Sequence, residues 1–377
     1  MKRLIFLLTI GLVPTALVFG QETDTIATRV VLIGDAGALV NGQQAVVQAI
    51  KKNVPLDKRT TIVYLGDNIY KIGLPDDAYV GYNEARQVLD SQVAILKGTQ
   101  AKAYLIPGNH DWNNGGPGGY DAIIREQLYV DLLNTNNVKF FPEGGCPGPV
   151  EVQIGPDVVL LIVDSQWWIH PYDKPGIESD CPYKTKDEVI AQIGDILTKN
   201  FNKLVIFATH HPFRSNGVHG GYFGLKQHIF PFTDLSKNLY IPLPVIGSIY
   251  PIARGVFGTP QDMKHPAYQN MITDLTEATK SHPNLIYAAG HEHNLQLIKD
   301  TGHFYIVSGS AYNSTRVNKS RKSHFVTQEH GFALLEISKN KNVRVSFYVT
   351  DVDTTKMAYT ENIIDFSKLP ELPKDTR

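Results

Sequence analysis

The sequence predicts an α/β fold built on mixed β-sheets, and two observations carry that prediction. Five apolar, β-branched runs of strand length alternate with amphipathic stretches of helical length, which indicates βαβ units. After residue 300 the pattern changes, because three further strand-like runs follow one another with few helical stretches between them. The sheets are therefore expected to be mixed rather than purely parallel.

The individual elements follow from these patterns. Strands are expected in the runs 30–33, 62–65, 103–106, 158–163, 204–208 and 285–289, and then at 304–307, 331–338 and 343–349. Helices are expected at 42–53, 78–97, 120–133, 186–198 and 265–281. The fourth helix begins after an acidic stretch of capping type, and the last is broken by His282-Pro283.

Composition and charge describe an ordinary globular chain of 377 residues. Hydrophobic residues make up 42% and charged residues 19%, which suits a protein that buries a sizeable core. Basic residues (36) nearly balance acidic ones (37), and no polybasic stripe is present. Specific nucleic-acid binding therefore has no electrostatic support.

The N-terminus has the pattern of a secretory signal peptide. Lys2 and Arg3 precede the apolar stretch Leu4–Phe19, and small residues allow cleavage near Gly20. We expect residues 1–20 to be a signal, residues 21–28 a tail, and the protein to be exported to the periplasm or secreted. An uncleaved membrane anchor is the alternative, although the stretch is short for a span of about 20 residues.

Two cysteines, Cys146 and Cys181, lie in loops rich in Pro and Gly on either side of the strand 158–163. An exported protein with two cysteines permits one disulfide, and we favour that pairing over free thiols. No CxxC spacing exists, so a zinc role for them is not expected.

Short polar motifs follow the apolar runs, at the points where strands would end. They are 34–37 (GDAG), 66–70 (GDNIY), 108–111 (GNHD), 210–212 (HHP), 219 (H) and 290–293 (GHEH). Each motif alone is weak, since Gly-Asp also occurs in turns and a lone His is more often a core residue. In open α/β sheets ligands bind at the carboxyl ends of strands, so together these side chains predict one polar cluster. Its carboxylates, amide, imidazoles and phenol suit a pair of hard or borderline metal ions.

In this order the motifs resemble those of the calcineurin-like metallophosphoesterases, and more narrowly the purple acid phosphatases. The run GHEHNLQ at 290–296 adds a likeness to tartrate-resistant acid phosphatase. The generic pattern has His two residues after the first Asp, where this chain has Gly37, and here Tyr70 stands three residues after Asp67. That exchange marks the purple acid branch. The resemblance implies a four-layer αββα sandwich of two mixed β-sheets flanked by helices over 29–350, followed by a C-terminal extension at 351–377.

The resemblance also implies a dinuclear metal centre of Fe(III) plus Fe(II), Zn or Mn. Seven residues would hold it: Asp35, Asp67, Tyr70, Asn109, His210, His291 and His293. Asp67 would bridge the ions, because a carboxylate can give one oxygen to both. Asp35, Tyr70 and His293 would complete the Fe(III) site, since a hard, anionic phenolate favours the ferric ion.

The second ion would be held by Asn109, His210 and His291, because an amide and two neutral imidazoles suit a borderline divalent metal. His110 and His219 are the expected catalytic residues, which would stabilise the phosphate and protonate the leaving group. A histidine is charged mainly below about pH 6.5, so an acidic optimum is expected. Of the neighbouring polar residues, His211 is expected to support His210 rather than to bind metal. Asp111 and Glu292 are expected either to contact the ligands without binding metal themselves or to be solvated.

The implied function is an exported acid phosphatase that hydrolyses phosphomonoesters by attack of a metal-bound hydroxide. A phosphodiesterase or nucleotidase on the same centre is the alternative. A non-catalytic surface-binding module is less favoured, because none of the seven ligands is missing. Small phosphate esters are the expected partners, with no obligate protein partner.

Residues 220–260 form an expected insertion directly after His219. Its stretch 239–251 is apolar, aromatic and too rich in proline for a helix. Loops of this length usually have a role, so a lid over the site, or contact with a membrane or partner, is one interpretation. Structural cover of the core is the other.

Overall fold

The computed structural model describes residues 25–133, 135–222, 226, 229–234, 238–243, 248, 258–351 and 354–367. The expected signal peptide and much of the insertion therefore lie outside the described residues. Within the described ranges no helix is both long and apolar enough to cross a membrane.

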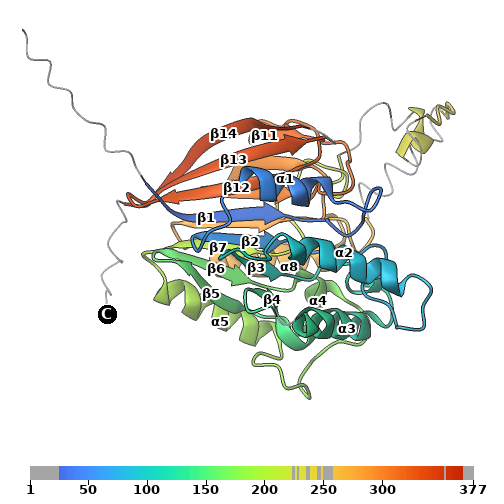
Figure 1. Cartoon of the computed structure of the whole chain (residues 1–377), viewed down its shortest axis with the longest axis horizontal. Coiled ribbons are helices and arrows are strands. Elements are labelled where there is room, and N and C mark those ends of the chain that lie inside the picture. Colours follow the sequence, from blue (N-terminus) through green and yellow to red (C-terminus); the bar gives the residue numbers. More distant parts are fainter. Residues whose placement is uncertain are drawn as a thin grey trace, which may run out of the picture.

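Two seven-stranded mixed sheets form the centre of the molecule (Figure 1). The first sheet has the order β14-β13-β12-β1-β2-β3-β4 and comprises Thr355–Asp365, Asn342–Thr350, Gly331–Ser338, Ile26–Ile33, Thr60–Tyr64, Lys102–Leu105 and Val138–Phe140. The second has the order β11-β9-β10-β8-β7-β6-β5 and comprises Ser323–Thr327, Leu295–Asp300, His303–Ser308, Leu285–Ala289, Leu204–Ala208, Val158–Ile162 and Val150–Gly155. β1 to β4 run parallel, as do β6, β7, β8 and β10, while the remaining strand pairs are antiparallel. The prediction of mixed sheets is confirmed.

Alternate residues of one strand show how the layers are held together. In β1, Val30 and Leu32 lie in the core between the two sheets, whereas Val31 and Ile33 lie in the core beneath the helices. Successive side chains of a strand point to opposite faces, so a strand that is apolar throughout must be covered on both sides. This explains why the central strands are continuous runs of Val, Ile and Leu rather than alternating ones.

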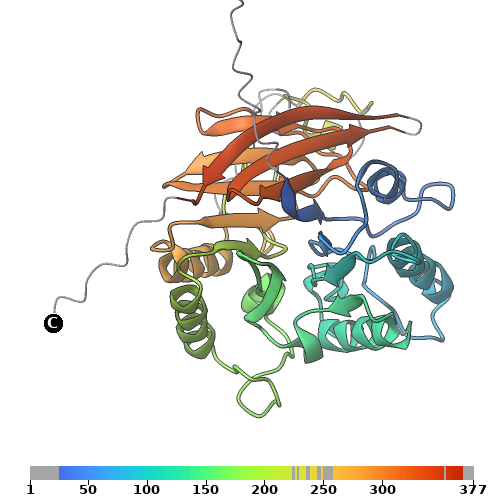
Figure 2. The same cartoon turned by 60° about the vertical axis from the view of Figure 1, so that its left-hand side comes forward.

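The helices cover the outer faces of the sandwich (Figure 2). Helices α1 (Ala45–Asn53), α2 (Tyr82–Ala94) and α3 (Gly119–Leu132) accompany the first sheet, and α5 (Lys186–Lys199) and α8 (Pro266–Thr279) pack together beside the second. The short α4 (Ser165–Ile169) follows β6, and the 3-10 turns are η1 (Asn113–Gly115), η2 (Glu143–Gly145) and η3 (Pro231–Asp234). The expected four-layer αββα sandwich is confirmed.

Both ends of the expected domain extend further than the sequence patterns indicated. β1 begins at Ile26, within the expected tail, and β14 lies within the expected C-terminal extension. β14 pairs with β13 from Thr355 to Asp365 and forms one edge of the first sheet. In the insertion, η3 stands apart from the two sheets (Figure 1). The lid interpretation lies largely outside the described residues and stays a prediction.

The predicted disulfide is confirmed. Cys146 and Cys181 are bonded, with 5.6 Å between their Cα atoms, and they close a loop of 35 residues that contains β5, β6 and α4. The bond thereby ties the chain after η2 to the segment that leads into α5.

Replacing both cysteines with serine is expected to lower the free energy of unfolding by about 3 kcal/mol, because the unfolded chain regains the freedom that the closed loop removes. Chemical denaturation of the double variant measures this change. Wild type reduced with a thiol should show the same shift. An unchanged midpoint in both samples would count against a stabilising role.

Candidate metal centre

The carboxyl ends of five strands bring the polar motifs to one place. Asp35 follows β1, Asp67 follows β2, Asn109 follows β3, His210 follows β7, and His291 with His293 follows β8. The first three strands belong to one sheet and the last two to the other. The candidate centre therefore lies across both sheets, and all of these residues except His293 are fully or almost fully buried.

Three of the predicted ligands form a first cluster. The Tyr70 hydroxyl lies 3.0 Å from Oδ1 of Asp35 and 3.1 Å from Nε2 of His293. Nε2 of His293 is 3.3 Å from the same Asp35 oxygen. A carboxylate oxygen of Asp67 lies within 4.8 Å of the potential ligand atoms of Asp35 and His293. A phenol, an imidazole and two carboxylates thus converge on one point.

The other predicted ligands form a second cluster beside the first. Oδ1 of Asn109 lies 3.0 Å from Nε2 of His210 and 3.0 Å from Nδ1 of His291, and these two nitrogens are 3.2 Å apart. Oδ1 of Asp67 lies 3.4 Å from Nε2 of His210. Asp67 therefore belongs to the surroundings of both clusters, as a bridging carboxylate must. The structure brings all seven predicted ligands together.

Electrostatics within the centre follow from its burial. Burial raises the pKa of Asp67, but the His210 and His110 rings outweigh it, so the net pKa lies below its usual range. Burial also raises the pKa of Tyr70 well above its usual value, and the charges of Asp35 and Asp67 raise it further. The raised pKa favours the protonated phenol of Tyr70, which a bound cation would have to offset to give a phenolate.

The donor set fits a pair of metal ions. Nε2 of His210 and Nδ1 of His291 are 3.2 Å apart and face a carbonyl oxygen, which brings three lone-pair atoms together. Burial, and then the neighbouring His219, lowers the pKa of His291 well below its usual value, which favours the neutral ring that a metal binds. The first cluster is richer in oxygen donors, with a single imidazole, and the second holds two imidazoles beside an amide oxygen, as expected for one hard and one borderline ion.

A second grouping of three histidines, His210, His211 and His291, also offers potential ligand atoms within 4.8 Å. His211 already makes two hydrogen bonds, from Nδ1 to the Ser165 hydroxyl at 2.8 Å and from Nε2 to Oε1 of Gln261 at 2.7 Å. Because both of its nitrogens are engaged, Asn109 rather than His211 completes the second cluster. The expectation that His211 only supports its neighbours agrees with these contacts.

The glycines of the motifs are required by close approach. A Cβ at Gly108 would lie 2.3 Å from Oδ1 of Asp67, and one at Gly66 would lie 2.6 Å from Nδ1 of His210. Asp35, Asp67 and His291 themselves have positive φ values of 60°, 54° and 66°. A non-glycine residue in this region costs on the order of 1–3 kcal/mol, so the surrounding structure holds these ligands in strained positions.

Asp111 is the buried group that joins two of the ligand loops. Its carboxylate accepts hydrogen bonds from the backbone N–H groups of Gly108 (2.7 Å), Asn68 (3.1 Å) and Ile69 (3.0 Å), and from the Asn68 side chain (3.2 Å). These bonds tie the loop that carries Asp67 to the loop that carries Asn109. Asp111 is thus fully buried rather than solvated.

Glu292 has a similar supporting role for the loop that carries His219. Its Oε1 accepts hydrogen bonds from the Ser215 hydroxyl (2.8 Å) and from the backbone N–H of Gly220 (3.0 Å). Glu292 therefore holds the loop on which His219 lies, and it too is buried.

The two predicted catalytic histidines flank the clusters. His110 donates its backbone N–H to Oδ1 of Asp67 at 2.8 Å, and its Nδ1 lies 2.7 Å from the carbonyl of Lys71. The His219 ring lies 4.2 Å from the His291 ring between centroids, and its Nδ1 lies 2.8 Å from Oδ1 of Asp262. In each ring the contact through Nδ1 fixes the orientation. Nε2 therefore lies on the edge of the ring away from the residue that contacts Nδ1.

Two residues that the motifs did not reveal also contact site histidines. Gln261 places its backbone carbonyl 2.8 Å from Nε2 of His291, and Asp262 contacts His219. Both lie directly after the insertion 220–260, in sequence with no recognisable pattern. Only their proximity to His219 and His291 in the folded chain identifies them.

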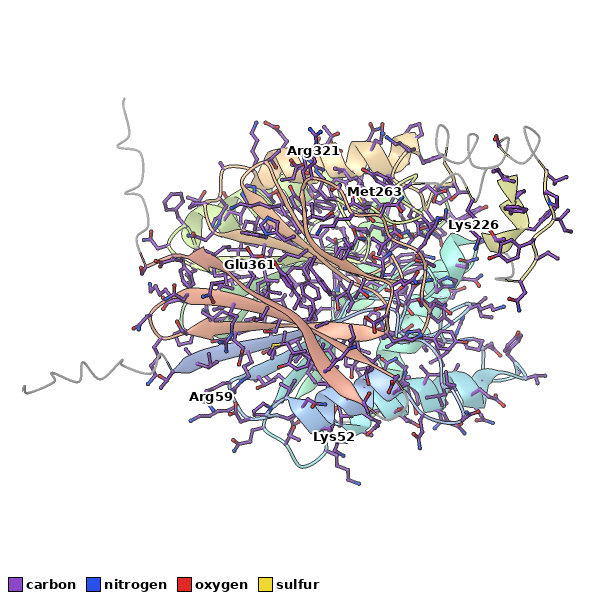
Figure 3. The ribbon with its side chains drawn as sticks, turned by 90° about the horizontal axis from the view of Figure 1, so that it is seen from above. Lys52, Arg59, Lys226, Met263, Arg321 and Glu361 are labelled. Carbon is purple, nitrogen blue, oxygen red and sulfur yellow. A yellow bond between two sulfur atoms is a disulfide. The ribbon has the colours of Figure 1, made fainter. Side chains whose placement is uncertain are left out.

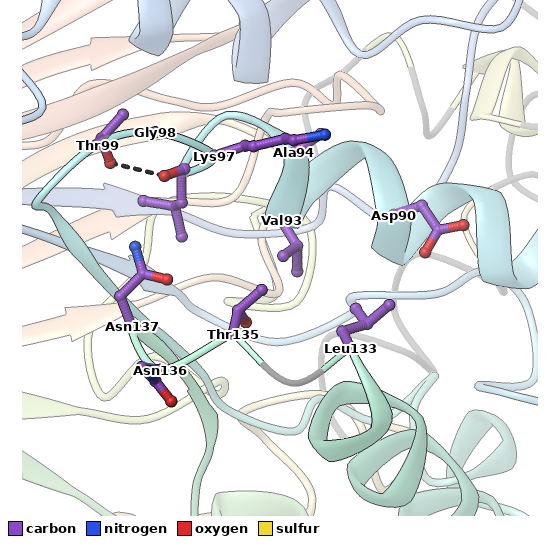
Figure 4. A pocket seen from close by; sticks show the side chains of 11 residues that line it. Asp90, Val93, Ala94, Lys97, Gly98, Thr99, Leu133, Thr135, Asn136 and Asn137 are labelled. Carbon is purple, nitrogen blue, oxygen red and sulfur yellow. Dashed lines mark hydrogen bonds between the residues drawn. The ribbon is translucent and has the colours of Figure 1, made fainter.

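Two sizeable cavities lie outside the clusters. One, of about 550 Å³, opens between the end of α2 and the loop after α3, lined by residues that include Asp90, Lys97 and Asn137 (Figure 4). The other, of about 540 Å³, lies between α8 and the His219 loop, which contributes Gly220 and Tyr222. The first is lined by none of the predicted site residues.

The fold and the clustered donors define a metal-dependent phosphoesterase. The family model of the calcineurin-like phosphoesterases matches residues 28–240, more than half of the chain, and the chain belongs to that family. The fold of this family implies a dinuclear metal centre, which the clusters can hold. No curated protein matches the chain in sequence.

Several solved structures share the fold. GAP50, described as the anchor in the inner membrane complex of Plasmodium, has a TM-score of 0.56 at 18% identity over 90% of this chain and 89% of that one. The purple acid phosphatase PPD1 of yellow lupin (Lupinus luteus) has a TM-score of 0.55 at 14% identity over 92% and 57%. PhoD has a TM-score of 0.50 at 10% identity over 90% and 70%. At these identities the likeness shows the fold, and it supports the resemblance to the purple acid phosphatases.

Proposed function

We propose that this protein is an exported, dinuclear metal-dependent acid phosphatase that hydrolyses phosphomonoesters. The observation that carries the proposal is the pair of adjacent donor clusters that share Asp67, with Tyr70 on the oxygen-rich side. Membership of the calcineurin-like phosphoesterase family supports the reaction class. The disulfide supports export, because such bonds persist in oxidising compartments.

Asp35, Asp67, Tyr70 and His293 would hold a ferric ion, and Asn109, His210 and His291, with Asp67 shared, a divalent ion such as Fe(II), Zn or Mn. When bound, such a pair polarises the phosphoryl oxygens and activates water.

The chain's own residues supply the other functions of the reaction. His110 and His219 flank the two clusters, so each can offer an N–H group to a phosphate oxygen or to the leaving oxygen. A histidine has its proton mainly below about pH 6.5, which favours an acidic optimum. Asp111 and Glu292 hold the loops of the ligands and of His219 in place.

A panel of esters on metal-loaded mature protein tests the proposal. We expect para-nitrophenyl phosphate to be hydrolysed at least about tenfold faster, by kcat/KM, than bis(para-nitrophenyl) phosphate, and faster at about pH 5 than at about pH 7.5. Preference for the diester would instead establish the phosphodiesterase alternative. Absence of turnover in protein with two bound metal equivalents would instead support a binding module, as the description of the structurally similar GAP50 as an anchor suggests.

A further inference from the structure

Asp262 is a buried carboxylate that is held firmly in place. It is 1% exposed, and its Oδ1 lies 2.8 Å from Nδ1 of His219, 43 residues earlier in the chain. Its Oδ2 accepts two further hydrogen bonds from Thr259, one from the backbone N–H at 2.8 Å and one from the hydroxyl at 2.9 Å. Because Thr259 fixes Oδ2 of Asp262, Oδ1 is held in a defined orientation toward the His219 ring.

The chain around Asp262 is also fixed against the site. The backbone N–H of Met263 donates to the His219 carbonyl at 2.9 Å, and the Gln261 carbonyl lies 2.8 Å from Nε2 of His291. Met263 lies on the opposite side of the molecule from Lys52 of α1 (Figure 3). The segment 259–263 thus contacts two neighbouring histidine rings, His219 and His291, and it lies beyond the residues matched by the family model.

The Nδ1 partners of the two flanking histidines differ in charge, although Nε2 of His110 lies 3.9 Å from Oδ2 of Asp67. Nδ1 of His110 faces the carbonyl of Lys71, which is neutral, whereas Nδ1 of His219 faces a carboxylate. A carboxylate accepts the Nδ1 proton of the ring and thereby fixes the orientation of the ring. The same contact leaves Nε2 on the edge of the His219 ring away from Asp262.

We propose that Asp262 is a positioning residue that orients His219 as the general acid, with His110 in the phosphate-stabilising role. The inference rests on the proposed phosphatase function. As water forms the new P–O bond and releases a proton to solvent, the ester P–O bond breaks and its electron pair goes to the leaving oxygen. That oxygen takes the Nε2 proton of His219. The ring is then neutral, keeps its proton on Nδ1 and donates it in the hydrogen bond to Asp262, and Nε2 regains a proton from solvent.

A series of leaving groups tests this role, because a poor leaving group needs the proton more than a good one. In Asp262→Asn, kcat for an alkyl phosphate should fall by about 10- to 100-fold, a part of the roughly 100- to 10,000-fold that a general acid contributes, because His219 itself remains. For 2,4-dinitrophenyl phosphate it should change by less than about twofold. Asp131→Asn, which removes an exposed carboxylate in the last turn of α3, serves as the matched control and should leave the whole series unchanged.

Two further variants separate positioning from structural damage. His219→Gln should show the same difference between the two esters, with a large loss of kcat for the alkyl phosphate and little loss for 2,4-dinitrophenyl phosphate. Adding Asp262→Asn to it should lower kcat no further, since both changes act on one group. Thr259→Val keeps the charge of Asp262 but removes one hydrogen bond to it. This variant should show a smaller difference in kcat between the two esters, in the same direction. An equal loss for all esters in Asp262→Asn, or a fully additive double variant, would overturn the proposal.

A measurement on metal-free protein gives an independent result. In ¹⁵N-histidine spectra the His219 signals, assigned by their loss in His219→Gln, should show the neutral ring protonated at Nδ1, and Asp262→Asn should shift the proton toward Nε2. An unchanged tautomer would contradict the inference. Wild type that hydrolyses no ester would instead refute the proposed function, so the two failures are distinguishable.

Discussion

Asp67→Asn is expected to empty both metal positions and to reduce ester hydrolysis on the order of 1,000-fold, more than the 10- to 100-fold typical of residues outside the ligand shell. Asp67 lies in the oxygen-rich cluster with Asp35 and His293, and its Oδ1 is 3.4 Å from Nε2 of His210 in the other cluster. Asparagine keeps the size of the side chain but removes the only charge that both clusters share. Metal analysis per protein molecule measures the first effect, and steady-state kinetics measures the second.

Asn109→Ala is the comparison for this prediction. Asn109 contacts only the second cluster, through its Oδ1 to His210 and His291. We therefore expect it to weaken the divalent position while the ferric position keeps its ion. Circular dichroism should show that both variants remain folded. Equal metal content in Asp67→Asn and wild type would show that Asp67 does not bridge.

Tyr70→Phe is expected to remove the visible absorption of the iron-loaded protein completely. The Tyr70 hydroxyl lies 3.0 Å from Asp35 and 3.1 Å from His293, so it is placed to become a ligand of the same ion. Burial first, and then the charge of Asp35, raise the pKa of Tyr70 well above its usual value, so a phenolate is expected only with metal bound. A phenolate on Fe(III) gives a charge-transfer band, and phenylalanine cannot.

Tyr312→Phe is the matched control for the colour. The Tyr312 ring lies 5.8 Å from the Tyr70 ring, so it shares the surroundings of the site without taking part in the described contacts of the first cluster. The band should persist in this variant. A colourless wild-type protein that contains iron and is fully active would refute the role given to Tyr70.

The element boundaries show where local sequence signals were sufficient. β12 runs from Gly331 to Ser338 as predicted, and α5 begins at Lys186 because Thr185 and Glu188 form a capping box. α1 begins at Ala45 rather than at the predicted Gly42, since Gly42 has a φ of 75° that no helix accommodates. In each case the deciding contacts lie within a few residues of the boundary, where a sequence pattern can report them.

The supporting contacts of the site could not be predicted in the same way. Asp111 joins the loops of Asp67 and Asn109 through bonds to residues 42 and 43 positions away, and Asp262 reaches His219 over 43 positions. Asp and Gln in a loop have the same local pattern whether they face solvent or a buried imidazole. Their roles depend on which distant segment the folded chain places beside them.

The sequence by itself determined the central strands, their alternation with helices and the side chains that could bind metal. The spacing of apolar residues and the motifs at strand ends are local properties of the chain, so a sequence pattern can report them. It also indicated the disulfide pair, since only two cysteines were available. The tertiary structure decided that the motifs of both sheets meet in two clusters about Asp67, that His211 is already engaged elsewhere, and that β14 completes the first sheet. Those outcomes depend on packing and hydrogen bonding between segments far apart in sequence, which no local pattern encodes.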